Sequence, residues 1–443
     1  MKHAHQHQRE RRERLIADMR AHTSGGLAAI PTAPEAVRNA DTHYPYRPDS
    51  HFYYLSGFPE PEAVVVLLAG RESGDSRQVL FCRDKNPERE IWDGFRYGPE
   101  AAREIFGFDE AYSIAELPAK LVDWTCDRPA LYTPLGLYPA WDHAITGTLN
   151  EVRNRVRTGI AAPETLIDVR APLSAMRLVK DAEELRSIRR AAEISSAAHR
   201  RAMARTQPGW YEYQAEAELA HEFLRHGAQS PAYPSIVASG PNACVLHYRE
   251  NNRQMQASDL LLIDAGCEYQ GYASDLTRTF PVGGRFSGTQ RAVYELVLAA
   301  QLACIDAVQP GKPFHDYHKV AERVLAQGLI DLRLCAGSLD AVLESGAYKQ
   351  FYMHRAGHWL GLDVHDVGLY RIAGESRPLE PGMVLTVEPG CYIRPAENVP
   401  EEFWDIGVRI EDDVLVTAEG AENLTAAAPK SLSDVEAACA RCG

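Results

Sequence analysis

The aliphatic run Leu260 to Ile263 leads directly into an acidic residue, Asp264. A short apolar run bounded by turn residues is typical of a strand that is buried on both faces. An unpaired carboxylate at the end of such a strand is strongly disfavoured. Whatever the fold, it must therefore bring a neutralising group to Asp264.

A second acid follows this strand after a turn-like stretch, Glu268 to Gly271. Asp275 opens the next predicted strand, and an antiparallel pair would bring the carboxylates of Asp264 and Asp275 side by side. Facing carboxylates repel each other unless a proton or a cation lies between them. The alternative is that these are two unrelated aspartates, each making turn or cap contacts at the end of a strand.

Three histidines cluster in the segment HRAGHWLGLDVH, at His354, His358 and His365. Clustered imidazoles indicate a metal site or a proton-transfer site. The spacing of His354 and His358 would suit a helix, but Gly357 and Gly361 break the helical pattern and the glutamate of H-E-x-x-H is missing. A zincin-type site is therefore not expected. Each histidine taken alone could also be a structural residue.

Two more acids belong to predicted strands. Glu388 ends the predicted strand 384–388, directly before Pro389-Gly390. In the predicted strand 406–416, alternation with a period of two places Arg409 and Glu411 on one face, so Arg409 could orient a carboxylate in the same layer. The alternative for this strand is an ordinary cross-strand ion pair.

Together these candidates offer four carboxylates and one imidazole without a thiolate, namely Asp264, Asp275, His358, Glu388 and Glu411. Two divalent cations would neutralise the carboxylates, and a water bridging both ions would be deprotonated to hydroxide near neutral pH. Oxygen-rich ligation favours Mn²⁺ over zinc, although Co²⁺ or Zn²⁺ could occupy the same site.

The periodic patterns divide the chain near residue 174. In the first part, strands at 63–69, 79–82 and 130–132 and a helix at 99–106 predict a small α/β domain. A long helix opens at Asp181 with Glu184, followed by helices at 212–226 and 287–308 and strands at 259–266, 275–282, 384–388 and 406–416. We therefore expect an α/β domain over 1–174 and, over 175–443, an α+β domain with helices followed by strands, twice over.

Composition excludes several classes of protein. The chain has 47 Lys plus Arg against 61 Asp plus Glu, a net charge of −14, which argues against a general nucleic-acid binder. The longest apolar run, 63–70, is far short of the ~20 residues that span a membrane. Residues 1–20 lack the apolar segment of a secretory signal, and nine scattered cysteines do not suggest a disulfide framework, so we expect a cytoplasmic protein. We interpret His3, His5 and His7 and the Cys439–Cys442 pair as parts of solvated termini.

These motifs resemble the aminopeptidase P family, within the pita-bread metallopeptidases that also include prolidase, methionine aminopeptidase and creatinase. The resemblance is carried by LLIDAGCEYQGYASDLTRTFPV (261–282), HWLGLDVHDVG (358–368), LEPGMVLTVEPGCY (379–392) and GVRIEDD (407–413), and in the first domain by RNADTHYPYRPDSHFYYLSGF (38–58) and IWDGFR (91–96). It implies a pita-bread catalytic domain after an α/β domain that serves the substrate pocket and oligomerisation.

The resemblance also implies roles for single residues. Asp264, Asp275, His358, Glu388 and Glu411 match the ligands of a dinuclear manganese site, the same five residues that the charge argument selects. Glu388 would assist deprotonation of the bridging water, and His247, His354 and His365 would surround the scissile peptide bond. His354, His365 and Arg409 would line the proline pocket. Trp92 would form the wall of the pocket for the first substrate side chain, with a core aromatic as the alternative. Asp41 would help at the mouth of the pocket, across a subunit contact, with a loop-capping acid as the alternative.

The implied activity is hydrolysis of an N-terminal Xaa-Pro bond by a hydroxide that bridges two metal ions, with peptides carrying proline second as substrates and a homodimer or homotetramer as the assembly. Proline has no N–H and a fixed φ, so a site that accepts it must be shaped for the ring. The alternatives are a prolidase, which would cleave only dipeptides, and a catalytically dead binding module, although such modules typically lose ligands. Arg355-Ala356 departs from the family pattern of a small and then an aliphatic residue, which leaves the subsite preference open.

Overall fold

The structure, a computed structural model, describes residues 5–440, and no helix in that range is long and apolar enough to cross a membrane. The chain forms two compact units, of which the first ends at Met176 and the second begins at Arg177. His3 and Cys442 lie outside the described residues. His5 packs its ring on Phe106 and His7 lies in the helix Gln6–Thr23, so the interpretation of these two residues as a solvated terminus is wrong. Cys439 is buried in the core of the second unit, so its interpretation as part of a solvated terminus is wrong.

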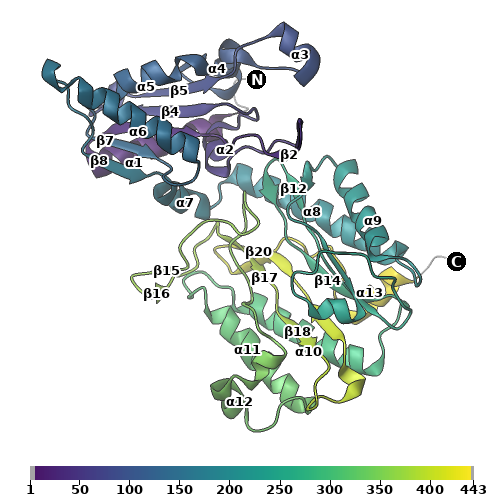
Figure 1. Ribbon diagram of the computed structural model, residues 1–443. Coiled ribbons are helices and arrows are strands. Elements are labelled where there is room, and N and C mark those ends of the chain that lie inside the picture. Colours follow the sequence, from purple (N-terminus) through teal and green to yellow (C-terminus); the bar gives the residue numbers. More distant parts are fainter. Residues whose placement is uncertain (1–4, 441–443) are drawn as a thin grey trace. The chain divides into compact units, whose positions relative to one another are not determined.

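The first unit is built around a six-stranded mixed sheet in the order β6-β5-β4-β1-β7-β8 (Figure 1). The strands of this unit are β1 (Gly26–Pro31), β2 (Val37–Asn39), β3 (Thr42–His43), β4 (Val64–Ala69), β5 (Arg77–Cys82), β6 (Glu110–Ser113), β7 (Ala130–Thr133) and β8 (Thr165–Asp168), where β2 and β3 form a separate hairpin. The helices are α1 (Gln6–Thr23), α2 (Ser50–Ser56), α3 (Pro87–Asp93), α4 (Gly98–Phe106), α5 (Leu117–Thr125), α6 (Pro139–Asn154) and α7 (Arg170–Leu178).

Both faces of this sheet are covered, because β1 and β4 are buried along their whole length. Leu27 of β1 and Val66 of β4 belong to one core cluster with Leu121 of α5 and Leu149 of α6. Helices α1 and α2 also contact β1 and β4, and successive side chains of a strand point to opposite faces. The predicted strands and the predicted helix of the first domain are all present, as a mixed α/β unit.

The second unit repeats one order of elements, helices followed by strands, as the sequence predicts. The first half contains α8 (Ala182–Arg205), α9 (Glu212–Arg225), β9 (Ser230–Pro231), β10 (Ile236–Ser239), β11 (Leu260–Asp264), β12 (Cys267–Tyr269), β13 (Tyr272–Ala273) and β14 (Thr277–Pro281). The second half contains α10 (Gly288–Ala307), α11 (Asp316–Asp331), α12 (Leu339–Ser345), β15 (Arg371–Ile372), β16 (Glu375–Ser376), β17 (Val384–Val387), β18 (Gly390–Ile393), β19 (Ile406–Arg409), β20 (Asp412–Val416), β21 (Ala421–Asn423) and α13 (Leu432–Cys439).

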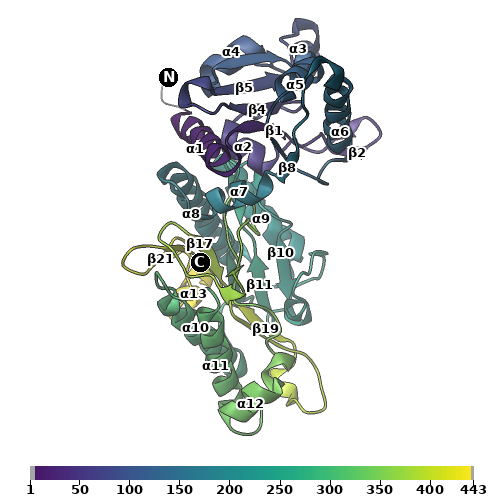
Figure 2. The ribbon, with the colours of Figure 1, turned by 90° about the vertical axis from the view of Figure 1, so that its left-hand side faces the viewer.

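Paired helices and short antiparallel sheets form this unit. Helix α8 packs on α9, and α10 packs on α11, a pair that lies side by side in both Figure 1 and Figure 2. The sheets have the orders β10-β11-β14, β13-β12-β9, β17-β20-β21, β18-β19 and β15-β16. Capping boxes begin α8, at Asp181 with Glu184, and α10, at Ser287 with Gln290, because each pair satisfies backbone N–H groups that the first helical turn leaves unpaired.

Two predicted strands differ from the observed ones. The predicted strand 275–282 begins only at Thr277, because the backbone N–H of Asp275 donates to the carboxylate of Asp413 rather than to a neighbouring strand. The predicted strand 406–416 is two strands, since β19 pairs with β18 while β20 pairs with β17. Glu411 lies at this change of partner, and its N–H donates to the carbonyl of Thr277.

A buried ion-pair network ties the start of the second unit to the histidine-bearing loop. Arg177 Nη2 and Lys180 Nζ donate to the carboxylate of Asp366 at 2.5 and 2.8 Å, and the three side chains are only 1% exposed. Arg177 also pairs with Asp363 at 2.8 Å. Burial opposes ionisation of Asp366, but the two cations hold the pKa of its carboxyl below the ordinary value. The residue before Asp366 is His365, so the network fixes the position of that histidine.

We expect Asp366→Asn to lower the free energy of unfolding of the second unit by about 3 kcal/mol at neutral pH, because it leaves buried cations without a full counter-charge. The pKa of Asp366 is lower in the folded than in the unfolded chain. Its stabilising contribution is therefore complete above the unfolded aspartate pKa of about 3.9, and it is lost as the pH falls through the folded value. Urea denaturation over a descending pH series, followed by circular dichroism, measures both effects.

The matched control is Glu193→Gln, which breaks an exposed pair with Arg190 at 3.0 Å on α8. Exposed pairs contribute little, so we expect a change below about 0.5 kcal/mol. If Asp366→Asn were as stable as this control, the buried network would contribute no net stability.

Candidate functional site

The five candidate metal ligands come from separate elements and meet in one pocket of the second unit, with a volume of about 840 Å³. Asp264 ends β11, Asp275 lies in the loop before β14, and Glu388 directly follows β17. Glu411 lies between β19 and β20, and His358 belongs to the loop that precedes β15. The structure thus brings together all five residues that the sequence selects, although they are up to 147 residues apart in the chain.

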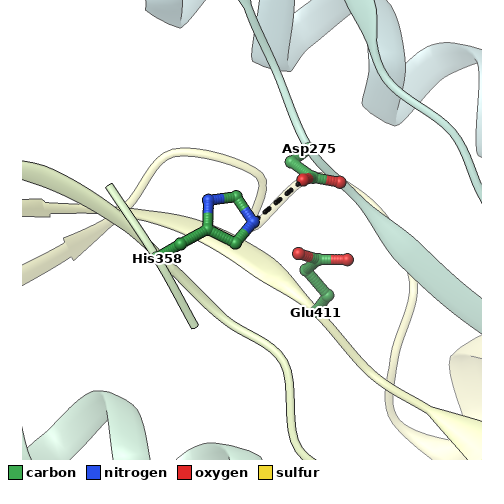
Figure 3. Close-up of side chains that lie close together, drawn as sticks. All are labelled: Asp275, His358 and Glu411. Atoms are coloured by element: carbon green, nitrogen blue, oxygen red, sulfur yellow. Dashed lines mark ion pairs between the residues drawn. The ribbon is translucent and has the colours of Figure 1, made fainter. Parts of the chain in front are cut away.

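Asp275, His358 and Glu411 form the tightest group, with one possible ligand atom from each lying within 4.8 Å of the others. Figure 3 shows the His358 ring directed at the two carboxylates, and His358 Nε2 lies 3.4 Å from Asp275 Oδ2. The same nitrogen lies 3.6 Å from Glu388 Oε1. Three acids therefore converge on one imidazole nitrogen.

Backbone contacts fix the orientation of His358. Its Nδ1 lies 2.9 Å from the carbonyl oxygen of Trp359, so Nδ1 donates to that oxygen and Nε2 faces the carboxylates. Burial opposes a charge on His358, but Asp275 and Glu388 raise the pKa of its imidazole to about 9, so Nε2 also carries a proton, which a bound cation would replace. The backbone N–H of His358 donates to Thr386 Oγ1 at 3.0 Å. At Gly357 a Cβ atom would fall 1.9 Å from the carbonyl oxygen of Thr386, so only glycine lets this loop pack directly on β17. An imidazole held in this way is arranged as a metal ligand.

Hydroxyl groups donate hydrogen bonds to some of the carboxylates. The Tyr233 hydroxyl lies 2.7 Å from Asp264 Oδ1 and 2.5 Å from Asp275 Oδ1. Because a hydroxyl has one proton, it can donate to only one of these two carboxylates at a time. Thr277 Oγ1 donates to Glu411 Oε2 at 2.5 Å. These bonds leave most of the carboxylate oxygen lone pairs in the cluster without a donor.

The charges of the cluster favour a bound cation. Burial, reinforced by neighbouring carboxylates, raises the pKa of Glu388 to about 7 and that of Glu411 well above its usual range. The pKa of Asp264 is raised as well, by burial and by Asp275, although Arg409 opposes that shift. One guanidinium, that of Arg409, thus faces four carboxylates, and this donor set fits two hard divalent cations.

Arg409 links the acidic cluster to the pocket wall. Its Nη2 donates to Asp264 Oδ2 at 2.6 Å and its Nη1 donates to the Tyr392 hydroxyl at 2.9 Å. The Tyr392 hydroxyl lies 2.8 Å from His354 Nε2, and His354 Nδ1 lies 2.8 Å from the carbonyl oxygen of Arg355. Both ring nitrogens of His354 are therefore engaged within the protein. The bond from Arg409 to Asp264 agrees with the prediction that Arg409 orients a carboxylate.

The other two pocket histidines are available to a ligand. The ring of His365 lies perpendicular to that of His358, with 4.3 Å between centroids, and burial together with His358 lowers the pKa of His365. His247 is exposed in the turn after residues 240–244 and lines the same pocket. Among the described residues, neither ring makes a hydrogen bond, so both can bind or protonate a substrate.

Comparison with known proteins agrees with this site. The model of metallopeptidase family M24 matches residues 186–418, and that of the aminopeptidase P N-terminal domain matches residues 8–132. The Xaa-Pro aminopeptidase of Escherichia coli strain K12 is 45% identical over 427 residues, which cover 96% of each chain. The chain belongs to the aminopeptidase P family of M24 metallopeptidases.

Solved structures of aminopeptidase P are similar over nearly the whole chain. Pseudomonas aeruginosa aminopeptidase PepP is 48% identical with a TM-score of 0.94, covering 98% of this chain and 97% of that one. Zinc-substituted Escherichia coli aminopeptidase P in complex with product is 44% identical with a TM-score of 0.95, covering 98% of each. The predicted fold, an α/β domain followed by a pita-bread catalytic domain, is confirmed.

Two residues that the aminopeptidase P resemblance selects lie in the first unit. Trp92 on α3 is 83% exposed, so its alternative interpretation as a core aromatic is wrong. Asp41 is exposed in the turn between β2 and β3. Their contact with the first substrate residue stays a prediction.

Sequence reasoning missed the hydroxyl groups that surround the candidate ligands of this aminopeptidase P site. Tyr233 lies in the stretch SPAYPS, whose prolines indicate a turn but no chemistry. Thr277 and Tyr392 lie in the segments 261–282 and 379–392, which carry the family resemblance, but the sequence predicts no role for either residue. Thr277 lies two residues past Asp275, and this proximity is the one signal that could have identified it.

We expect Tyr233→Phe to weaken Mn²⁺ binding at the aminopeptidase P site by about tenfold, because it removes a hydroxyl that orients two ligand carboxylates. Burial and Asp264 raise the pKa of Tyr233, so the wild-type hydroxyl keeps its proton at neutral pH. Calorimetric titration of metal-free protein with Mn²⁺ measures the affinity. Tyr213→Phe, at an exposed ring stacked on Tyr211, is the control, and equal affinities in the two variants would contradict the role of Tyr233.

Proposed function

We propose that this chain is a metallo-aminopeptidase that hydrolyses the N-terminal Xaa-Pro bond of peptides and releases one residue. The observation that carries the proposal is the convergence of four carboxylates and His358 in one pocket beside two unengaged histidines. The relatives named Xaa-Pro aminopeptidase and the product complex of Escherichia coli aminopeptidase P support the choice of substrate.

We infer that two divalent cations bind this site and that Mn²⁺ is the native ion. Their ligands are Asp264, Asp275, His358, Glu388 and Glu411. The oxygen-rich donor set supports Mn²⁺, with Co²⁺ or Zn²⁺ as substitutes. Bound there, the two cations neutralise the carboxylates and lower the pKa of the attacking water, which makes it a nucleophile at neutral pH.

Side chains of the protein accept and donate the protons that the reaction transfers. Glu388 accepts the proton of the attacking water, a role that its place among the candidate ligands in the pocket supports. His365 and His247 donate hydrogen bonds to the oxygen that becomes negative as the carbonyl carbon turns tetrahedral. One of these groups then protonates the nitrogen of proline as the C–N bond breaks. His354, whose ring nitrogens are occupied, acts by shape and position.

Proline selectivity follows from a rigid wall at one side of the pocket. The chain of contacts from Asp264 through Arg409 and Tyr392 to His354 immobilises that wall. Proline brings a compact saturated ring without an N–H donor, so a wall that needs no hydrogen bond from the substrate backbone accepts it without loss. We propose that His354, His365 and Arg409 shape this proline pocket.

We further propose that the first unit contributes Trp92 and Asp41 to binding of the first substrate residue and holds copies of the chain together as a dimer or tetramer. The eight described cysteines are all free, which supports a reducing compartment such as the cytoplasm.

We expect manganese-loaded protein to cleave an Ala-Pro-Ala tripeptide between the first two residues and to act on longer peptides as well. The free amino group and the proline pocket define the substrate, so the length beyond proline does not limit it. Amino-acid analysis of the products measures cleavage, with metal-free protein as the control. Cleavage confined to the dipeptide Ala-Pro would instead establish a prolidase, and inertness toward every Xaa-Pro peptide would leave a binding module.

Two alanine variants separate ligation from proton transfer. Glu388→Ala should abolish turnover and lose bound metal, because it removes both a ligand and the base. His365→Ala should lower kcat by about 10²–10³-fold while metal content stays unchanged, because it removes only a hydrogen-bond donor. Metal analysis of each purified variant beside its kcat provides the test. Metal loss in His365→Ala would make His365 a ligand, and turnover at the wild-type rate in Glu388→Ala would overturn the assignment.

A further inference from the structure

Two arginines at the rim of the pocket take no part in the proposed reaction. We propose that Arg355 and Arg371, with Lys349 beside them, form a downstream subsite that binds a carboxylate carried by the substrate one or two residues beyond proline. This inference rests on the proposed function, because it takes His354 as the position of proline.

A second pocket, with a volume of about 470 Å³, continues from the first. We call it the basic groove and define it by His315, Lys319, Lys349, Arg355 and Arg371. Four residues line both pockets, namely His315, His354, Arg355 and Arg371. A peptide whose proline lies at His354 therefore meets the basic groove next.

The spacing suits the residues that follow proline. Arg355 is the chain neighbour of His354, and its side chain is exposed. An extended peptide advances about 3.3 Å per residue, so a carboxylate one or two residues past proline comes within reach of this guanidinium. Arg371 on β15 is exposed as well, on a separate segment of the groove.

The charges of the groove are almost all positive. Among its described lining residues Glu322 is the one carboxylate, and it is occupied by the Tyr348 hydroxyl and by His318 at 3.5 Å. Within the described part of the chain, Arg355, Arg371 and Lys349 form no ion pair with an acid. Lys319 is different, because it pairs with Asp316 at 3.0 Å. Three cations thus face the groove without a protein counter-charge.

The pKa of a histidine at the rim, His315, is lowered by burial and by nearby positive charges. Burial lowers the pKa of His315, and Arg355, Arg371 and Lys319 lower it further. Arg355 Nη1 lies 3.3 Å from both ring nitrogens of His315, so the guanidinium rests on a neutral imidazole that holds it at the rim. Cations held together without an acid favour an anionic ligand.

A carboxylate is the anion that a peptide supplies. It matches the planar guanidinium fork of arginine, which can donate two parallel hydrogen bonds to it. The carboxylate can come from an Asp or Glu side chain or from the C-terminus of a short peptide. The chemistry is the same in both cases, so matched peptides must distinguish the two sources.

Peptides that begin with proline test the subsite without any need for turnover, because they correspond to the products that would remain in the downstream sites. We expect wild-type, metal-loaded protein to bind Pro-Asp-Ala-amide about fivefold more tightly than Pro-Asn-Ala-amide at low ionic strength, a preference that salt weakens. The pair Pro-Ala and Pro-Ala-amide tests the terminal carboxylate in the same way. Isothermal titration calorimetry measures all four affinities.

The double variant Arg355→Gln with Arg371→Gln should bind the acidic and the neutral peptides equally, and reversal of both charges to Glu should favour Pro-Lys-Ala-amide. Arg323→Gln, an exposed arginine of α11 outside both pockets, should keep the wild-type preference. A preference in either peptide pair that the double variant abolishes supports the subsite and identifies the source of the carboxylate. Equal binding within both pairs by the wild-type protein, or a preference that the double variant retains, overturns it.

Hydrolysis is scored separately, on Ala-Pro-Asn-Ala-amide, which carries no carboxylate. If the wild-type protein cleaves this neutral peptide, the proposed function holds whatever the binding data show. If it does not, the proposed function fails, and the assignment of the groove to residues beyond proline fails with it. A preference for acidic peptides that persists would then show only that the basic groove binds anions.

Discussion

Mutual repulsion among four carboxylates, two of them buried and two half-buried, is the constraint on which the second unit depends. Asp264, Asp275, Glu388 and Glu411 share one pocket, and desolvation makes each charge more costly there than at the surface. No attraction among these groups holds the cluster together. The backbone must hold them instead, and this explains why each acid is anchored at the end of a strand or in a tight connection between strands rather than on a flexible loop tip.

The two halves of the unit are joined at this cluster. The first half supplies Asp264 and Asp275, and the second supplies His358, Glu388 and Glu411. Beneath them the fully buried Arg278 of β14 donates to the carbonyl oxygen of Glu411 at 2.6 Å and to Asp412 at 2.7 Å. This cation joins the two halves where the acids repel each other, so contacts within the protein alone hold the candidate ligands in place.

The sequence predicts the acids of the site better than their surroundings. Asp264 and Glu388 follow aliphatic runs, and strand ends next to turns are where a buried carboxylate can reach a shared pocket. The two wrong strand boundaries have one physical origin, because tertiary hydrogen bonds decide where strands begin and end. Asp275 stays outside β14 because its N–H donates to Asp413, and β19 and β20 separate because they pair with different neighbours. Tyr233 and Thr277 left no pattern, since one hydroxyl in a turn or strand carries no periodic signal.

Local charge, rather than the total, decides which peptides such a protein accepts. A net charge of −14 would seem to disfavour acidic peptides, yet exposed charges are screened beyond a Debye length of about 8 Å at physiological ionic strength. Within that range, cations bound by the acid cluster would leave its net charge near zero, while Arg355, Arg371 and Lys349 line the next stretch of the substrate path. On the proposed path of the substrate, the charges beyond proline are therefore mostly positive. Substitutions at these rim positions would change selectivity downstream of the scissile bond without altering the five candidate ligands.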